Sequence, residues 1–263
     1  MPVALVNLAS GSKGNATCVL GAGGGVLVDC GLSRRETLRR LAAAGVDRRR
    51  IQAVLLTHEH TDHVRGAARV AAALDAPLLM TAGTARASGL GALPGARLLA
   101  PGVPVNVAGM TVLPVATSHD AAEPCAYRLA DRHGAVLLAT DLGTADDLPA
   151  AALAGLDTLL VEANHDPDLL RDGPYPAFLK ARIAGPRGHL SNRQGGELVA
   201  RVRRHSPRLS TVVLAHLSEK NNRPELALAG ARAAAGATAG GLRWLVARQD
   251  RITVVEREDG ACG

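Results

Sequence analysis

Three histidines and an aspartate fall within one six-residue segment, 58–63, which reads His-Glu-His-Thr-Asp-His. In an extended segment alternate side chains share one side, which places His58 together with His60. Asp62 and His63 come at the start of a helix-like run, so their side chains point to a second position next to the one that His58 and His60 share. Imidazole and carboxylate groups are ligands of zinc, manganese and iron. This short loop could therefore supply two ligands to each of two metal ions.

Short apolar runs and helix-like runs intermix along the whole chain. We expect strands within residues 3–9, 16–20, 25–31, 52–57, 78–80, 103–108, 110–116, 126–141, 156–164, 210–216, 244–247 and 252–255. We expect helices within residues 34–45, 64–75, 192–205 and 223–236. Turns at Ala108-Gly109 and His133-Gly134 add hairpins, which favours an α/β or α+β sandwich over a simple doubly wound sheet. No repeat or low-complexity linker divides the chain, so we expect a single domain over residues 1–263.

The composition narrows the class of protein further. Of the 263 residues 47% are hydrophobic, which fits a globular chain and excludes a disordered one. Only 2% are aromatic, which excludes nucleic-acid binding through many stacked aromatic platforms. The formal net charge is +6, and arginines cluster within 34–40, 48–50 and 201–208. These clusters could be solvated helix faces, or they could form a track for an anionic partner.

The sequence also bears on where the protein works. No segment reaches the roughly 18 continuous apolar residues that span a bilayer, so we expect no membrane partner. The N-terminal segment has neither the charged region nor the long apolar region of a secretion signal. The four cysteines show no CxxC spacing and are interpreted as buried or incidental thiols. We therefore expect a cytoplasmic, reduced protein.

The motif at 58–63 resembles the signature of the metallo-β-lactamase superfamily, which folds as a four-layer αββα sandwich and binds up to two metals. The resemblance implies that the remaining ligands follow three later apolar runs, at His119, Asp141 and His216. It further implies that one metal is held by His58, His60 and His119, the other by Asp62, His63 and His216, and that Asp141 bridges the two.

Five further motifs narrow the resemblance. They are Ser10-Gly11-Ser12-x-Gly14-Asn15, Ser118-His119-Asp120-Ala121, Glu162-x-Asn164-His165-Asp166, Gly188-His189-Leu190-Ser191-Asn192 and His216-Leu217-Ser218-Glu219-Lys220-Asn221-Asn222. Their order and spacing are similar to those of the YycJ/WalJ (VicX) family of bacterial metallo-hydrolases. Members of this family are associated with DNA exonuclease activity and with operons that regulate the cell wall. The resemblance covers nearly the whole chain.

Two closely spaced divalent ions can generate a hydroxide near neutral pH and stabilise both oxygens of a displacement at phosphorus. We therefore predict a metal-dependent phosphodiesterase that uses this hydroxide, with Asp62 holding metal and nucleophile. By resemblance we expect a 5′-to-3′ DNA exonuclease that grips the phosphate backbone. His189 is similar to the phosphate-side histidine of the β-CASP nucleases and is our candidate to contact the phosphate. Asp141 and His189 are too close in sequence to enclose an inserted β-CASP domain of roughly 100 residues.

Other residues of these motifs are candidates for contact with substrate: Ser12, Asn15, Asn164, His165, Ser191 and Asn192. Each also has a structural interpretation. The segment 10–15 could present backbone amides to a phosphate or could simply be a glycine-rich turn. His165 could touch substrate or cap backbone groups. Glu59 is interpreted as a surface residue rather than a catalytic one.

Two other functions stay open at this point. The same metal centre could hydrolyse a small ester, thioester or cyclic phosphodiester, or the chain could be a metal-binding regulatory module. The ligand set suits zinc or manganese, and iron also fits. RNA is the alternative polyanion, and a homodimer is the base-rate expectation for a soluble enzyme.

Overall fold

The computed structural model describes residues 4–256 of the chain. Its first sheet has the strand order β14-β1-β2-β3-β4-β5-β6 and its second sheet the order β13-β12-β11-β10-β9-β8-β7. The strands of the first sheet are β14 (Thr253–Val255), β1 (Ala4–Ala9), β2 (Ala16–Leu20), β3 (Gly25–Val28), β4 (Ile51–Leu55), β5 (Leu78–Thr81) and β6 (Arg97–Leu99). Those of the second are β13 (Arg243–Val246), β12 (Thr211–Ala215), β11 (Thr158–Glu162), β10 (Gly134–Ala139), β9 (Cys125–Asp131), β8 (Met110–Ala116) and β7 (Val105–Val107).

The two sheets are built on the same plan. In each one an antiparallel half continues into a parallel half, with the change at β3 in the first sheet and at β10 in the second. Parallel strands need crossover connections, and these carry the helices onto the outer faces of the sheets. The helices are α1 (Arg34–Ala43), α2 (Thr61–Val64), α3 (Ala67–Leu74), α4 (Ala82–Ser88), α5 (Ala150–Leu153), α6 (Pro167–Asp172), α7 (Ala177–Ile183), α8 (Asn192–His205) and α9 (Pro224–Ala235).

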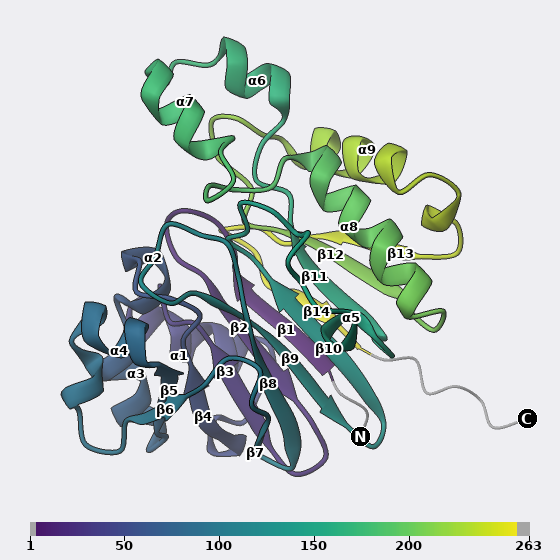
Figure 1. Ribbon diagram of the computed structural model, residues 1–263. Coiled ribbons are helices and arrows are strands. Elements are labelled where there is room, and N and C mark those ends of the chain that lie inside the picture. The colour runs from purple at the N-terminus through teal and green to yellow at the C-terminus, as the bar shows by residue number, and fades with distance from the viewer. Residues whose placement is uncertain (1–3, 257–263) are drawn as a thin grey trace, which may run out of the picture.

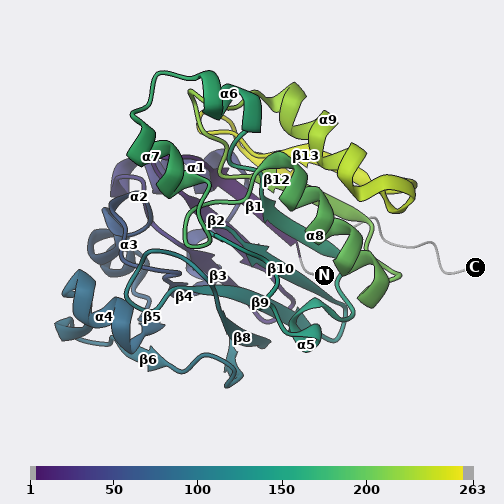
Figure 2. The same ribbon diagram turned by 45° about the horizontal axis from the view of Figure 1, so that its top comes forward.

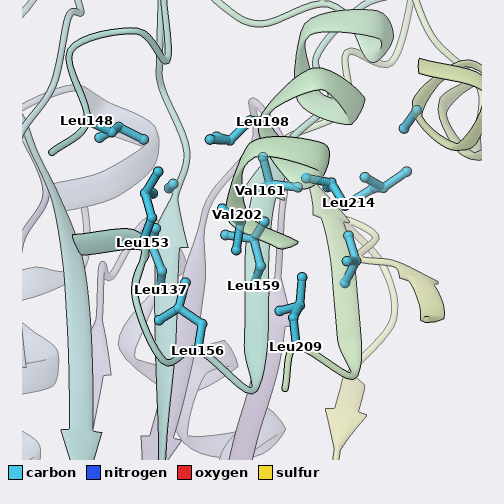
Figure 3. Packing of buried hydrophobic residues seen from close by; sticks show 14 of the residues in the cluster. Leu137, Leu148, Leu153, Leu156, Leu159, Val161, Leu198, Val202, Leu209 and Leu214 are labelled. Atoms are coloured by element: carbon cyan, nitrogen blue, oxygen red, sulfur yellow. The ribbon is translucent and has the colours of Figure 1, made fainter. Parts of the chain in front are cut away.

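Three apolar clusters hold the layers together. The cluster between the sheets includes Val28 from the first sheet with Tyr127 and Leu138 from the second. A second cluster joins the first sheet to α1, α3 and α4. A third joins the second sheet to α5, α8 and α9, where Leu198 and Val202 of α8 face the strands (Figure 3). Strands buried on both faces must be apolar throughout, and this explains the continuous apolar runs in the sequence. The predicted α/β fold, a four-layer αββα sandwich, is confirmed (Figure 1).

The structure differs from the predicted elements in two respects. The helix expected over 64–75 begins only at Ala67, as α3, because α2 ends at Val64 and Gly66 between them donates its N–H to the carbonyl of Cys30. A Cβ at Gly66 would lie 2.0 Å from the Leu32 carbonyl oxygen, so only glycine allows this close approach. The elements α4, β6, α5, α6 and α7 were not predicted. For α6 the sequence held a signal, since Asp166 caps the helix and Pro167 occupies its first turn.

The segment between Asp141 and His189 contains α5, β11, α6 and α7. Helices α6 and α7 project beyond the sandwich at the edge where the strands of both sheets end (Figures 1 and 2). No helix within residues 4–256 has both the length and the apolar composition that a membrane span requires. Cys262 and both ends of the predicted domain, 1–263, lie outside the described residues, and the single-domain organisation stays a prediction.

Candidate metal centre

The candidate ligands gather at one edge of the sandwich because each follows the end of a strand. His58 follows β4, His119 follows β8, Asp141 follows β10 and His216 follows β12. Asp141 has φ 59° and His216 has φ 56°, values in the left-handed region that non-glycine residues seldom adopt. Such backbone strain concentrates at functional sites, where the surrounding structure holds it in place. Here it turns the side chains out of the strand direction and toward one another.

The first ligand group contains His58, His60 and His119, which can place one ring nitrogen each within 4.8 Å of the others. His119 Nδ1 donates to the carbonyl of Gly188 at 2.9 Å, which leaves its Nε2 lone pair free. Burial, reinforced by the neighbouring histidines, holds the pKa of His58 well below its usual value. Burial also lowers the pKa of His119. The imidazoles of His58 and His119 are therefore neutral, the form that binds a metal.

The second group contains Asp62, His63 and His216. Asp62 Oδ2 lies 3.4 Å from His216 Nε2 and 3.5 Å from His63 Nε2. Burial acts to raise the pKa of Asp62, but hydrogen bonds from His216 and His63 outweigh it and hold the pKa well below its usual value. Burial acts to lower the pKa of both histidines. The carboxylate of Asp141, together with other carboxylates that contact each ring, outweighs burial and raises the pKa of both.

Asp141 lies between the two groups. Its Oδ2 is 3.3 Å from His63 Nε2, and its Oδ1 is 3.8 Å from His119 Nε2. Among the residues that the structure describes, three buried site atoms have no hydrogen-bond partner: His58 Nε2, His119 Nε2 and Asp141 Oδ2. Orphaned polar atoms are rare in protein interiors, and these three belong to metal-ligand types that converge on one point. The donor set therefore fits divalent metal ions.

A cavity of about 300 Å³ lies over the ligand groups, and His60, Asp62, His119, Asp141 and His216 line it. His189 and Ser12 lie in its wall together with Leu179, Arg182 and Ile183 of α7. Arg182 Nε binds Asp120 Oδ2 at 2.5 Å, which ties α7 to the loop that bears His119. The geometry thus combines a cluster of metal-ligand residues, a partly covered pocket and polar groups directed into it.

Residues 25–217 match the family model described as Beta-lactamase superfamily domain. The chain is 34% identical over 226 residues to "Exodeoxyribonuclease WalJ" of Streptococcus pneumoniae serotype 2 (strain D39 / NCTC 7466), covering 84% of this chain and 83% of that protein. It is 33% identical to "Exodeoxyribonuclease YycJ" of Bacillus anthracis, covering 84% of each. The chain belongs to the WalJ/YycJ family of the β-lactamase superfamily. Among solved structures, the metallo-β-lactamase fold protein YhfI from Bacillus subtilis superposes with a TM-score of 0.71 at 16% identity, covering 96% of this chain and 100% of that one.

Two acidic residues of this WalJ/YycJ chain support the ligands and were not assigned a role from the sequence. Asp29 Oδ2 accepts a hydrogen bond from His63 Nδ1 at 2.8 Å, and Glu162 Oε1 accepts one from His216 Nδ1 at 2.9 Å. Such partners fix the tautomer of a histidine and its orientation toward a metal. Each acid comes directly at the end of an apolar run, GVLVD and TLLVE, the same signal that marks Asp141.

Glu162 also holds His189. The His189 Nδ1 atom donates to Glu162 Oε1 at 2.8 Å, and the backbone N–H groups of Leu142 and Leu190 donate to Oε2 at 3.0 Å each. Burial acts to lower the pKa of His189, but the Glu162 carboxylate outweighs it and raises that pKa. Glu162 therefore couples a candidate ligand, His216, to the residue predicted to face the phosphate.

The candidate substrate residues fall into separate places. The structure brings Ser12 and His189 into the pocket wall, whereas Asn15 supports the ligands because its Nδ2 donates to Asp62 Oδ2 at 3.2 Å. The others lie outside the pocket lining. Asn164 donates to the His216 carbonyl, Ser191 caps α8 in a capping box with Gln194, Asn192 pairs with Asn222, and His165 is buried.

Five of the eleven clustered arginines are occupied within the protein by the contacts that follow. Arg40, Arg50, Arg201 and Arg203 donate to backbone carbonyls, and Arg208 pairs with Asp157. Glu59 is half-buried and accepts a hydrogen bond from the Ala122 N–H, so it supports the loop that follows His119. An arginine that caps carbonyls contributes to stability, and its full hydrogen-bonding capacity is not free for a phosphate.

Proposed function

We propose that this chain is a metal-dependent exodeoxyribonuclease that hydrolyses phosphodiester bonds from a 5′ end of DNA. The observation that carries the proposal is the placement of two candidate ligand groups, joined by Asp141, at the floor of one pocket whose wall contains His189. Two relatives with over four-fifths coverage are named exodeoxyribonucleases, which supports DNA as the substrate.

Two divalent ions would be held at this floor, one by the first ligand group and one by the second, with Asp141 shared. The first group is His58, His60 and His119, and the second is Asp62, His63 and His216. When bound, such ions supply a nucleophile near neutral pH and neutralise charge on phosphate oxygens. Zinc or manganese suits the donor set, and iron is the alternative.

Asp62 orients the attacking water. Its side chain is 24% exposed, in the pocket lining, whereas Asp141 is 4% exposed beneath it. The lowered pKa of Asp62 leaves its carboxylate ionised, the form that binds a metal and accepts a hydrogen bond from water. Asn15 holds the carboxylate in place from the other side.

His189 acts on the phosphate. Its Nδ1 is bound by Glu162, so Nε2 is the nitrogen available to the pocket. The raised pKa of His189 favours the imidazolium, which donates a hydrogen bond to a non-bridging phosphate oxygen and gains most as charge develops there. Ser12, on the opposite strand-end loop, adds a hydroxyl donor to the same pocket.

The test compares cleavage of end-labelled oligonucleotides by the metal-loaded protein and by Asp62→Ala, His189→Ala and Asp147→Ala. Asp147 is exposed and serves as the matched carboxylate control. We expect Asp62→Ala to abolish cleavage, His189→Ala to lower kcat by about 100-fold, and Asp147→Ala to behave as wild type. Mononucleotides released from the 5′ end would show the polarity. Intact DNA and RNA after prolonged incubation would refute the nuclease assignment.

The same assay separates the other functions. Turnover of bis-p-nitrophenyl phosphate without any oligonucleotide cleavage would indicate a small-molecule hydrolase. One tightly bound ion by metal analysis, without hydrolysis of either substrate, would indicate a regulatory module. RNA as substrate, a homodimer and a cytoplasmic location stay predictions from the sequence.

A further inference from the structure

Helices α6 and α7 form a lobe over the pocket that the proposed chemistry does not use. The lobe, residues 167–183, projects beyond the sandwich next to the metal-ligand edge (Figures 1 and 2). Every residue of α7 is at least partly exposed, so the helix is not needed to cover a core. Leu179, Arg182 and Ile183 nevertheless line the pocket, as does Tyr175 just before the helix.

The lobe also holds two of the four aromatic side chains of a chain that has one Trp, two Tyr and one Phe. Tyr127 is fully buried between the sheets, and Trp244 is half-buried with its Nε1 donating to the Ala239 carbonyl. Half-buried Tyr175, in the pocket wall, and exposed Phe178 are left, three residues apart. Phe178 is 76% exposed, the most exposed large apolar side chain within residues 4–256. Isolated exposed apolar residues are ordinary, but this one lies one helical turn from Arg182 at the pocket rim.

The charges around these rings indicate what would cover them. Lys220 Nζ lies 5.6 Å from the centre of the Tyr175 ring, and Arg182 lines the same wall. Flat rings beside cations complement a nucleic-acid end, in which bases alternate with phosphates. Arg182 already pairs with Asp120, so the Lys220 ammonium beside the Tyr175 ring is the charge that an apolar protein partner would leave without a counterpart.

We propose that Tyr175 and Phe178 form a stacking platform for the terminal nucleobases of the DNA strand whose phosphate lies over the ligand groups. This inference rests on the proposed nuclease function and adds to it the part of the substrate that α7 recognises. Stacking on an aromatic ring tolerates every base, because each base has a π-face. The platform therefore gives grip at the strand end without sequence preference.

The test crosses a change in the protein with a change in the substrate. Wild type and Phe178→Ala are assayed on oligonucleotides whose terminal nucleotide carries a base or is abasic. For wild type we expect KM to rise about tenfold when this base is removed, the loss of one stacked base. For Phe178→Ala we expect the raised KM with both substrates, and kcat unchanged in all four combinations. Tyr175→Leu should behave like Phe178→Ala, whereas Phe178→Trp should restore the wild-type pattern.

Leu98→Ala is the matched control, since Leu98 is 64% exposed on β6, a strand at the far edge of the first sheet. In wild type, an equal KM for ends that carry a base and for abasic ends would overturn the proposal. Wild-type behaviour of Phe178→Ala would overturn it as well. Phe178→Leu with full discrimination would overturn it too, because a leucine has no π-face. A shift from dimer to monomer in Phe178→Ala, without loss of base discrimination, would make this face an interface between copies instead. If wild type cleaves neither oligonucleotide, the nuclease assignment itself has failed, which is a different result from cleavage without discrimination.

Discussion

Replacing Glu162 by glutamine should separate the support of the ligands from the ligands themselves. Glu162 is fully buried and accepts four hydrogen bonds, two from histidines on Oε1 and two from backbone N–H groups on Oε2. A glutamine has a single oxygen, so two of the four donors lose their acceptor. Each buried donor left without a partner costs about 1–3 kcal/mol, which gives about 2–6 kcal/mol in total. That is a large part of the roughly 5–15 kcal/mol by which a typical domain is stable.

The orientation of the new glutamine amide decides whether the variant loses metal affinity or only stability. If its NH₂ group faces the histidines, His216 must carry its proton on Nε2, the nitrogen that lies beside Asp62. Metal affinity at the second ligand group should then fall about 10- to 100-fold, the usual effect of removing a partner that orients a ligand. If the NH₂ group faces the backbone donors instead, the metal affinity is preserved and the loss appears in stability alone.

Two measurements on Glu162→Gln distinguish these outcomes. Urea unfolding in the presence of a chelator reports the free energy of unfolding without metal, and a competition titration reports the zinc affinity. Glu36→Gln is the control, because Glu36 is a surface carboxylate paired with Arg39 and Arg40. Its loss should cost less than about 1 kcal/mol and leave the zinc affinity unchanged. Wild-type urea midpoint and wild-type zinc affinity in Glu162→Gln would refute the role assigned to this carboxylate.

Two further predictions concern the surroundings of the ligands. Gly31→Ala should lower metal affinity and activity, because a Cβ there would lie 1.7 Å from the Asp62 carbonyl oxygen. The control is Gly240→Ala, where a Cβ would have its nearest contact at 3.5 Å, and this variant should match wild type in the same zinc titration. Burial lowers the pKa of His165 from 6.5 to about 4. Between these pH values the unfolded chain therefore binds a proton that the folded chain does not. The stability contributed by the neutral His165 is fully present above pH 6.5 and is lost as the pH falls toward 4. Metal-free His165→Gln should therefore lose about 2 kcal/mol less than wild type between pH 7 and pH 4.5 by urea unfolding. An equal loss in both proteins would contradict a neutral buried His165.

The sequence predicted the fold well where the signal was local. Strands buried on both faces must be apolar throughout, so β10, β11 and β12 stand out as continuous apolar runs. Helix α8 was likewise predicted from its local run of residues, and the structure adds a capping box at Ser191 and Gln194 where it starts. Helices α6 and α7 were missed because they have short, largely exposed faces with little apolar periodicity to detect.

The arginine clusters show the opposite case. From the sequence they could be an anion track or a set of solvated side chains, and the charge count could not distinguish the two. In the structure Arg40 reaches the carbonyls of Leu8 and Gln249, the latter 209 positions away in the chain. Hydrogen bonds of this kind depend on chain segments that only folding brings together, so no local pattern predicts them.

The sequence by itself determined where the apolar runs stop and that metal-ligand residue types follow them. The motif at 58–63 is a local signal, whereas His119, Asp141 and His216 were named through the resemblance to the metallo-β-lactamase superfamily. Tertiary structure alone decided how they are held: Glu162 serves both His189 and His216, which lie 27 and 54 positions further along the chain. A hydrogen bond requires an approach of about 3 Å, and two segments far apart in sequence reach that distance only when the sheets have packed.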